Sequence, residues 1–131
     1  MKVHALRLKP EQELRQAIEE FVKENNIKAG CIVTGIGSLN HVRLRLADLK
    51  VESFYGNFEI VSFTGTLSQD KVHLHLSIAD RLGRVVGGHL KIGIVQTTVE
   101  LVIGELKEYE FKRLYDEQTG FEELMVFKNE H

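Results

Sequence analysis

Residues 72–90 read VHLHLSIADRLGRVVGGHL, and this stretch predicts a β-hairpin. Apolar residues occupy every second position from Val72 to Ile78, which is typical of a strand with one buried and one polar face. The connection that follows contains Gly83, which can supply the left-handed residue of a three-residue hairpin loop. The segment therefore predicts two antiparallel strands joined by a short loop at 81–83.

This loop also predicts which residues lie opposite each other. It pairs Asp80 with Arg84, and stepping back along both strands pairs His75 with His89. Directly opposed residues have Cβ atoms about 5 Å apart and face the same side of the sheet. His73 shares that side, about 7 Å along the strand from His75. The spacing therefore brings three histidines together.

Three converging imidazoles are a candidate metal site. They can bind one ion at Zn–N distances of about 2 Å, and neutral imidazoles favour zinc or a similar divalent ion. Three protein ligands leave an open position, as in catalytic zinc sites. Two alternatives stay open. A two-residue loop or a bulge at Gly87-Gly88 would turn His89 to the other face, and the histidines can also lie on a solvated sheet face without a metal.

Outside the hairpin, one segment has helical spacing. Its apolar stripe comprises Leu14, Ala17, Ile18, Phe21 and Val22. Pro10 is expected as the first helical residue, and Asn25 and Asn26 are expected to end the helix. The sequence therefore predicts one helix near the N-terminus.

The remaining segments alternate or form short apolar runs, which predicts strands. The predicted strands cover 31–36, 41–48, 58–67, 72–79, 84–90, 94–105, 108–115 and 121–127. Gly35 and Gly37 interrupt the first segment, where we expect them to relieve a tight bend rather than to form a phosphate loop. Little room is left for crossover helices. The predicted fold class is α+β, with a mostly antiparallel, strongly twisted β-sheet or half-barrel and one helix near the N-terminus.

Composition and charge indicate which classes of protein this chain can belong to. The chain has 131 residues, 43% of them hydrophobic, which predicts a single globular domain over 1–131. Its net charge of −2 gives no basic excess for a nucleic-acid backbone. Residues 105–131 carry 8 acidic and 4 basic side chains, and we expect a hairpin turn and a solvated face there. A signal peptide or membrane span is not expected, so a cytoplasmic protein is predicted.

Four motifs in order resemble those of the PPC (plant and prokaryote conserved) domain family. They are GCIVTGIGSL (30–39), GNFEIVSFTGTLS (56–68), the stretch 72–90 and TTVELVIGE (97–105), and the resemblance covers about residues 3–115. It implies a compact α+β domain that assembles as a trimer. Prokaryotic-type members bind zinc through the same pattern, which implies that His73, His75 and His89 are the ligands here.

The resemblance has limits. Plant members carry an AT-hook that this chain lacks, and Asn57 replaces the arginine of their GRFEI segment, through which they contact other proteins. DNA binding is therefore not expected here. More distantly, the histidine pattern is similar to that of acetolactate decarboxylase, a zinc enzyme, which favours enzyme chemistry by analogy only.

Other residues are weaker candidates. Glu59 and Glu100 each interrupt an apolar strand, so each can be a general base or fourth metal ligand, although an outward-facing strand position is favoured. Arg43 and Arg45 can hold an anionic substrate, and a solvated face explains them equally well. Ser38 can line a pocket. Cys31 is expected to be a small buried residue.

Two function classes follow. The first is a zinc-binding trimer that acts as a metal-dependent lyase or hydrolase on a small anionic molecule. The alternative is a non-catalytic trimeric regulatory or DNA-associated binding module. Whether the protein is an enzyme stays open at this point. The expected partners are two further copies of the chain and a small anionic ligand, without nucleic acid or membrane.

Overall fold

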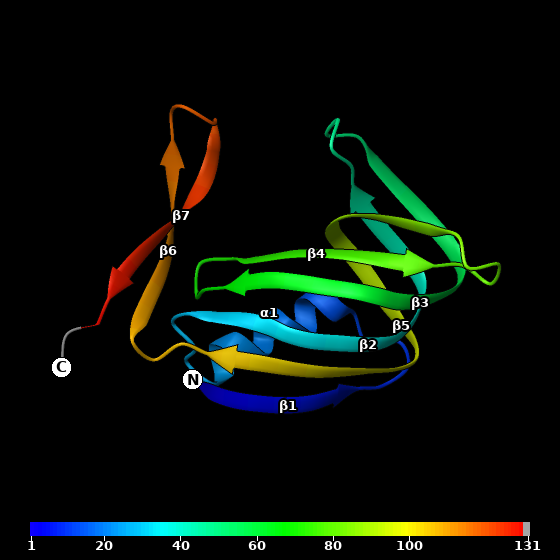
Figure 1. The fold of residues 1–131 in the computed structure, drawn as a ribbon, viewed down its shortest axis with the longest axis horizontal. Coiled ribbons are helices and arrows are strands. Elements are labelled where there is room, and N and C mark those ends of the chain that lie inside the picture. Colours follow the sequence, from blue (N-terminus) through cyan, green and yellow to red (C-terminus); the bar gives the residue numbers. More distant parts are fainter. Residues whose placement is uncertain (130–131) are drawn as a thin grey trace.

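The computed structural model describes residues 1–129 (Figure 1). In chain order its elements are β1 (Lys2–Leu8), α1 (Leu14–Glu24), β2 (Gly30–Arg45), β3 (Val51–Leu67), β4 (Val72–Ala79), β5 (Val85–Glu105), β6 (Tyr109–Asp116) and β7 (Phe121–Lys128). Residues 130 and 131 of the predicted domain lie outside the described residues.

Five strands form one antiparallel sheet in the order β1-β5-β2-β3-β4. The sheet curls so far that β4 also pairs with β5, which makes a ring of strands without closing a barrel. Strands β6 and β7 form a separate hairpin beside this ring (Figure 1). The predicted mostly antiparallel α+β fold with one N-terminal helix is confirmed.

Helix α1 covers the sheet with the predicted apolar stripe. Leu14, Ile18 and Val22 are buried on its inner side, where the helix contacts β4 and β5. Their spacing of four residues places them on one helix face, and buried strand residues such as Leu90 complete the core.

The predicted helix start was wrong. The helix begins at Leu14 rather than at Pro10, because the Glu13 carboxylate accepts hydrogen bonds from the backbone N–H groups of Arg15 and Gln16 at 2.9 Å each. The predicted end was right. Asn25 caps the helix and Asn26 adopts the left-handed conformation with φ of 50°.

The structure also corrects the strand boundaries. Strand β1 was not predicted, because the polar residue His4 interrupts the apolar side of its alternating pattern. In the structure His4 is half-buried and its Nε2 atom forms a hydrogen bond with the Glu105 carboxylate at 2.9 Å. Two pairs of predicted strands are each one continuous strand in the structure. Strand β2 joins the predicted strands 31–36 and 41–48, and β5 joins 84–90 and 94–105. Register shifts after Gly37 and Leu39 bend β2 instead of ending it, as expected of β-bulges.

The described chain contains no helix with the length and apolar composition needed to cross a bilayer. The only helix within residues 1–129 has 11 residues and exposes one polar face.

Candidate metal centre

The β4–β5 hairpin has the predicted register. The backbone N–H of Asp80 donates to the Arg84 carbonyl at 2.9 Å, and Gly83 closes the loop with φ of 79°. His75 lies directly opposite His89. No register shift occurs at Gly87-Gly88, so the alternative with a bulge there is excluded.

The two glycines let β5 pass between its neighbours. A Cβ atom at Gly87 would lie 2.9 Å from the Leu76 carbonyl oxygen, and one at Gly88 would lie 2.8 Å from the Arg45 carbonyl oxygen. Side chains at either position would therefore push β5 away from β4 or β2. This close passage leaves His89 only 7% exposed.

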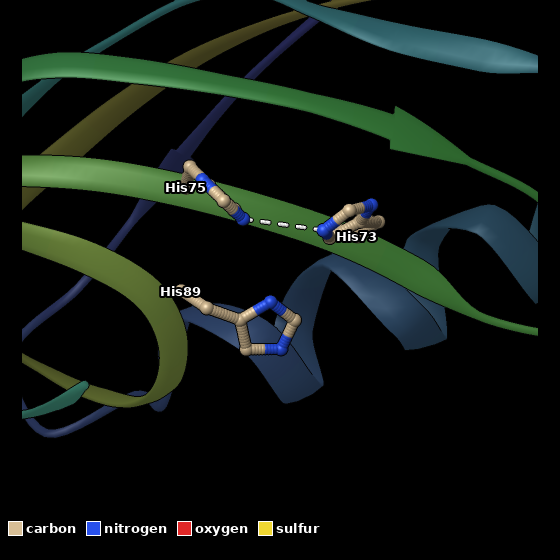
Figure 2. A group of neighbouring side chains, drawn as sticks. All are labelled: His73, His75 and His89. Atoms are coloured by element: carbon tan, nitrogen blue, oxygen red, sulfur yellow. Dashed lines mark hydrogen bonds between the residues drawn. The ribbon is translucent and has the colours of Figure 1, made fainter. Parts of the chain in front are cut away.

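The structure brings the three histidines together, and Figure 2 shows their rings turned toward one another. One ring nitrogen from each lies within 4.8 Å of the other two, and the Nε2 atoms of His73 and His75 are 3.2 Å apart. In a tetrahedral zinc site with Zn–N bonds of about 2 Å, ligand nitrogens lie about 3.3 Å apart. The group therefore fits a divalent ion after small ring movements.

A further observation fits a ligand role. The Nδ1 atom of His89 is buried and has no hydrogen-bond partner within the described residues. A buried polar atom without a partner is costly, and it is rare in native structures unless an ion or water occupies the site.

The surroundings keep the rings of His73 and His89 neutral. Burial, followed by the charge of Arg45 and the neighbouring histidines, lowers the pKa of His89 to about 3. Burial also lowers the pKa of His73, with His75 and Arg113 as the next causes. At neutral pH His73 and His89 are therefore uncharged, which is the form that binds a metal.

Charged side chains, of which only Arg45 was a candidate from the sequence, lie beside two of the histidines. A pocket of about 220 Å³ beside His73 and His89 is lined by Arg45, Leu49, Lys71, Arg113, Phe121, Glu122 and Glu123. The last four of these belong to the β6–β7 hairpin. The predicted hairpin turn at the C-terminal end is present, and most side chains of β7 are solvent-exposed, as expected. In addition, one side of the hairpin lines the pocket beside the histidines. Nothing in the local sequence pattern indicates that this hairpin docks beside the histidines.

The other candidates lie elsewhere. Glu59 is exposed and lines a separate pocket of about 550 Å³, together with Ser38, which thus lines a pocket as predicted. Glu100 is exposed on the outer face of β5, opposite Arg7 of β1. Neither glutamate belongs to the group of close ligand atoms formed by the histidines.

Of the two candidate arginines only Arg45 lies beside the histidines, and Cys31 is not part of the histidine group. Arg45 lines the pocket beside the histidines, whereas Arg43 is exposed and donates to the Ser53 hydroxyl at 3.3 Å. Cys31 is a free, half-buried thiol beside Gly104, outside the histidine group.

Comparison with known proteins adds relatives of the whole chain. The GlmU bifunctional protein of Synechococcus sp. strain JA-3-3Ab is 41% identical over 130 residues, which is 98% of this chain. The chain spans only 21% of that protein's length. A protein of Salmonella enterica has the same fold with a TM-score of 0.93 and 40% identity, covering 97% of this chain and 94% of the other.

A third relative, from Archaeoglobus fulgidus, is described as metal-containing. It matches with a TM-score of 0.81 and 29% identity, covering 95% of this chain and 94% of its own. The model of the Plants and Prokaryotes Conserved (PCC) domain matches residues 1–107, most of the chain and all of its five-stranded sheet. The chain therefore belongs to the Plants and Prokaryotes Conserved domain family, for which the abbreviation PPC is also used.

Proposed function

We propose that this domain binds one zinc ion through His73, His75 and His89, and that the ion keeps a coordination position open to a small anionic molecule. The observation that carries the proposal is the convergence of three imidazole nitrogens within 4.8 Å, of which the buried His89 Nδ1 has no other partner among the described residues. The metal-containing relative from Archaeoglobus fulgidus supports a metal at this fold.

A zinc ion held in this way would support a lyase or hydrolase reaction. A zinc ion with an open position polarises a carbonyl group or lowers the pKa of bound water. The chain itself would hold the ion through the three imidazoles and present Glu122 and Glu123 from the pocket wall. A carboxylate beside an open metal site can accept a proton from water or substrate.

A non-catalytic trimeric module is the second candidate. It is favoured by the positions of Glu59 and Glu100, which lie on exposed strand positions outside the histidine group and so supply no acid or base there. In this case zinc would stabilise the β4–β5 hairpin or report metal status. The two candidates differ in whether a small molecule is converted.

Metal content tests the proposed function. We expect protein that has been stripped with a chelator and reloaded with zinc to retain about one ion per chain in elemental analysis after dialysis. Cobalt in place of zinc should give the intense visible absorption of a four-coordinate site. If the protein retains no zinc after dialysis, the proposal is contradicted. The same holds if protein loaded with zinc loses its ion as readily as protein loaded with magnesium.

We further propose that the domain assembles as a trimer through the outer face of β1, β5 and β2. This face exposes Val3 (55%), Val33 (49%) and Ile36 (54%), a grouping of apolar side chains that is costly in water. Sedimentation equilibrium should give three times the chain mass of 14.9 kDa. Ile36→Glu should shift this mass toward the monomer, because it buries a charge in the contact.

The matched control for this variant is Leu82→Glu in the β4–β5 loop. Leu82 is 68% exposed and lies off the proposed contact face, so its substitution should leave the trimer mass unchanged. A monomeric wild type, or an Ile36→Glu variant that stays trimeric at micromolar concentration, argues against this interface.

Duplex DNA is not expected to bind. Binding to a DNA backbone needs clustered lysine and arginine residues, whereas this chain has a net charge of −2 and places Glu122 and Glu123 beside its cationic side chains. Fluorescence anisotropy at physiological salt should detect no complex, with or without zinc. Submicromolar affinity that weakens steeply with salt would favour the DNA-associated alternative.

A further inference from the structure

The β6–β7 hairpin forms one wall of the histidine site. In Figure 1 it stands beside the turn that joins β3 to β4. Two hydrogen bonds fix it there. The Arg113 backbone N–H donates to the Asp70 carboxylate at 3.0 Å, and Arg113 Nη2 donates to the Thr66 hydroxyl at 3.0 Å. Thr66 lies directly opposite His73, so the Arg113 guanidinium is held beside the histidines.

This arginine has a donor left over. Its Nε atom is buried and has no hydrogen-bond partner within residues 1–129. The side chain forms no ion pair with a carboxylate of the described chain, and neither do those of Arg45 and Lys71, which line the same pocket. A buried N–H without an acceptor, next to cations that form no ion pair, is an arrangement that a bound anion can complete.

The charges of the pocket oppose a metal ion that binds alone. The lining holds three cations and the two carboxylates of Glu122 and Glu123, which leaves a net charge of +1 before any metal is added. A divalent metal ion bound by the histidines adds two further positive charges. These positive charges lower the affinity for a metal ion that binds alone, and an anion that binds with the metal offsets them, because like charges repel each other. The same charges attract an oxyanion to the open position of the metal.

We propose that Arg113, with Arg45 and Lys71, is the specificity-determining anion-binding group of this site, and that its ligand is a small oxyanion with at least two negatively charged oxygens, a phosphate or a dicarboxylate. One oxygen binds the metal and another accepts hydrogen bonds from Arg113. The inference rests on the proposed metal site. It goes beyond the family match, which ends at residue 107 and does not reach Arg113.

The test compares Arg113→Gln with Lys112→Gln. Both variants remove one positive charge from β6, but Lys112 is exposed and points to the opposite face of the hairpin. Calorimetric titration of the zinc-loaded proteins with inorganic phosphate and with malonate, at constant ionic strength, measures anion affinity. Acetate serves as the anion with a single charge, and the phosphate and malonate arms separate the two ligand classes.

We expect Arg113→Gln to weaken phosphate or malonate binding at least about 10-fold, the size of one charge-assisted hydrogen bond. Lys112→Gln should stay close to wild type, and acetate should bind more weakly than either dianion. Zinc affinity measured without added anion should be equal or higher in Arg113→Gln, because a repelling charge is gone. Whichever of phosphate and malonate binds more tightly should also raise the zinc affinity of the wild type, since coupling between two ligands is reciprocal.

Equal anion affinity in Arg113→Gln and wild type, or equal losses in both variants, would overturn the inference. If the wild type retains no zinc, the proposed function fails, and the same titrations of the zinc-free protein decide the inference. Anion binding that depends on Arg113 supports it there, and its absence overturns it. Should Arg113→Gln lose the folded circular-dichroism spectrum, Lys71→Gln replaces it, because Lys71 is exposed and lies in the same pocket.

Discussion

His75→Ala is expected to lower zinc affinity by at least about 100-fold, because losing an outer partner of a metal ligand already costs 10–100-fold and this substitution removes a ligand itself. Only two imidazoles would then remain on the ion. Competition with a chromophoric chelator measures the affinity directly. The metal-free fold should change little, because the His75 side chain is exposed.

His41→Ala is the matched control for this prediction. It also removes a strand histidine, but His41 stacks on Tyr55 with ring centroids 4.4 Å apart and is not a member of the ligand group. Its zinc affinity should equal that of wild type. The assignment of His75 as a zinc ligand is contradicted if His75→Ala takes up as much zinc as the wild type. It is also contradicted if His41→Ala loses as much zinc affinity as His75→Ala.

Gly37→Ala should destabilise the protein by roughly 2–5 kcal/mol, combining the strain of an unfavourable backbone conformation with overpacking. Gly37 adopts φ of 141° at the bulge of β2. A Cβ atom there would collide with the Thr98 carbonyl oxygen and lie 2.8 Å from the Val99 Cα. Urea unfolding at a fixed protein concentration measures the loss as a lower midpoint with an unchanged slope.

Gly83→Ala separates the two causes. Gly83 also has a positive φ, of 79°, but a Cβ atom there would meet nothing within 4 Å. Only the conformational penalty of about 1–2 kcal/mol should remain. If both variants lose the same free energy of unfolding, the close approach of β2 and β5 at Gly37 contributes nothing, contrary to the prediction.

The parts of the site that were predicted correctly depend on neighbours in sequence. The pairing of His75 with His89 follows from one loop of three residues, since Gly83 fixes the turn and the strands on either side then continue in step. The stripe from Leu14 to Val22 likewise needs only the helical repeat of 3.6 residues. Both predictions use interactions that span a few residues.

The parts that were missed depend on partners far along the chain. Strand β1 is defined by β5, about a hundred residues away, whose Glu105 accepts the otherwise misplaced His4. The helix start moved to Leu14 because the Glu13 side chain caps the helix and also accepts from the backbone N–H of Gly93 in β5 at 2.9 Å. No local pattern carries this information.

By itself the sequence determined the antiparallel fold class, the N-terminal helix and the face on which three histidines meet, because periodicity and turn chemistry are local. Only the tertiary structure decided what surrounds these histidines. Arg45 comes from β2, Lys71 from the turn before β4, and Arg113 from a hairpin that follows the ring. They meet because the sheet curls until β4 pairs with β5, and because Asp70 and Thr66 anchor that hairpin through contacts more than forty residues apart in the chain. Such contacts form only when the whole core closes, so no short stretch of sequence can specify them.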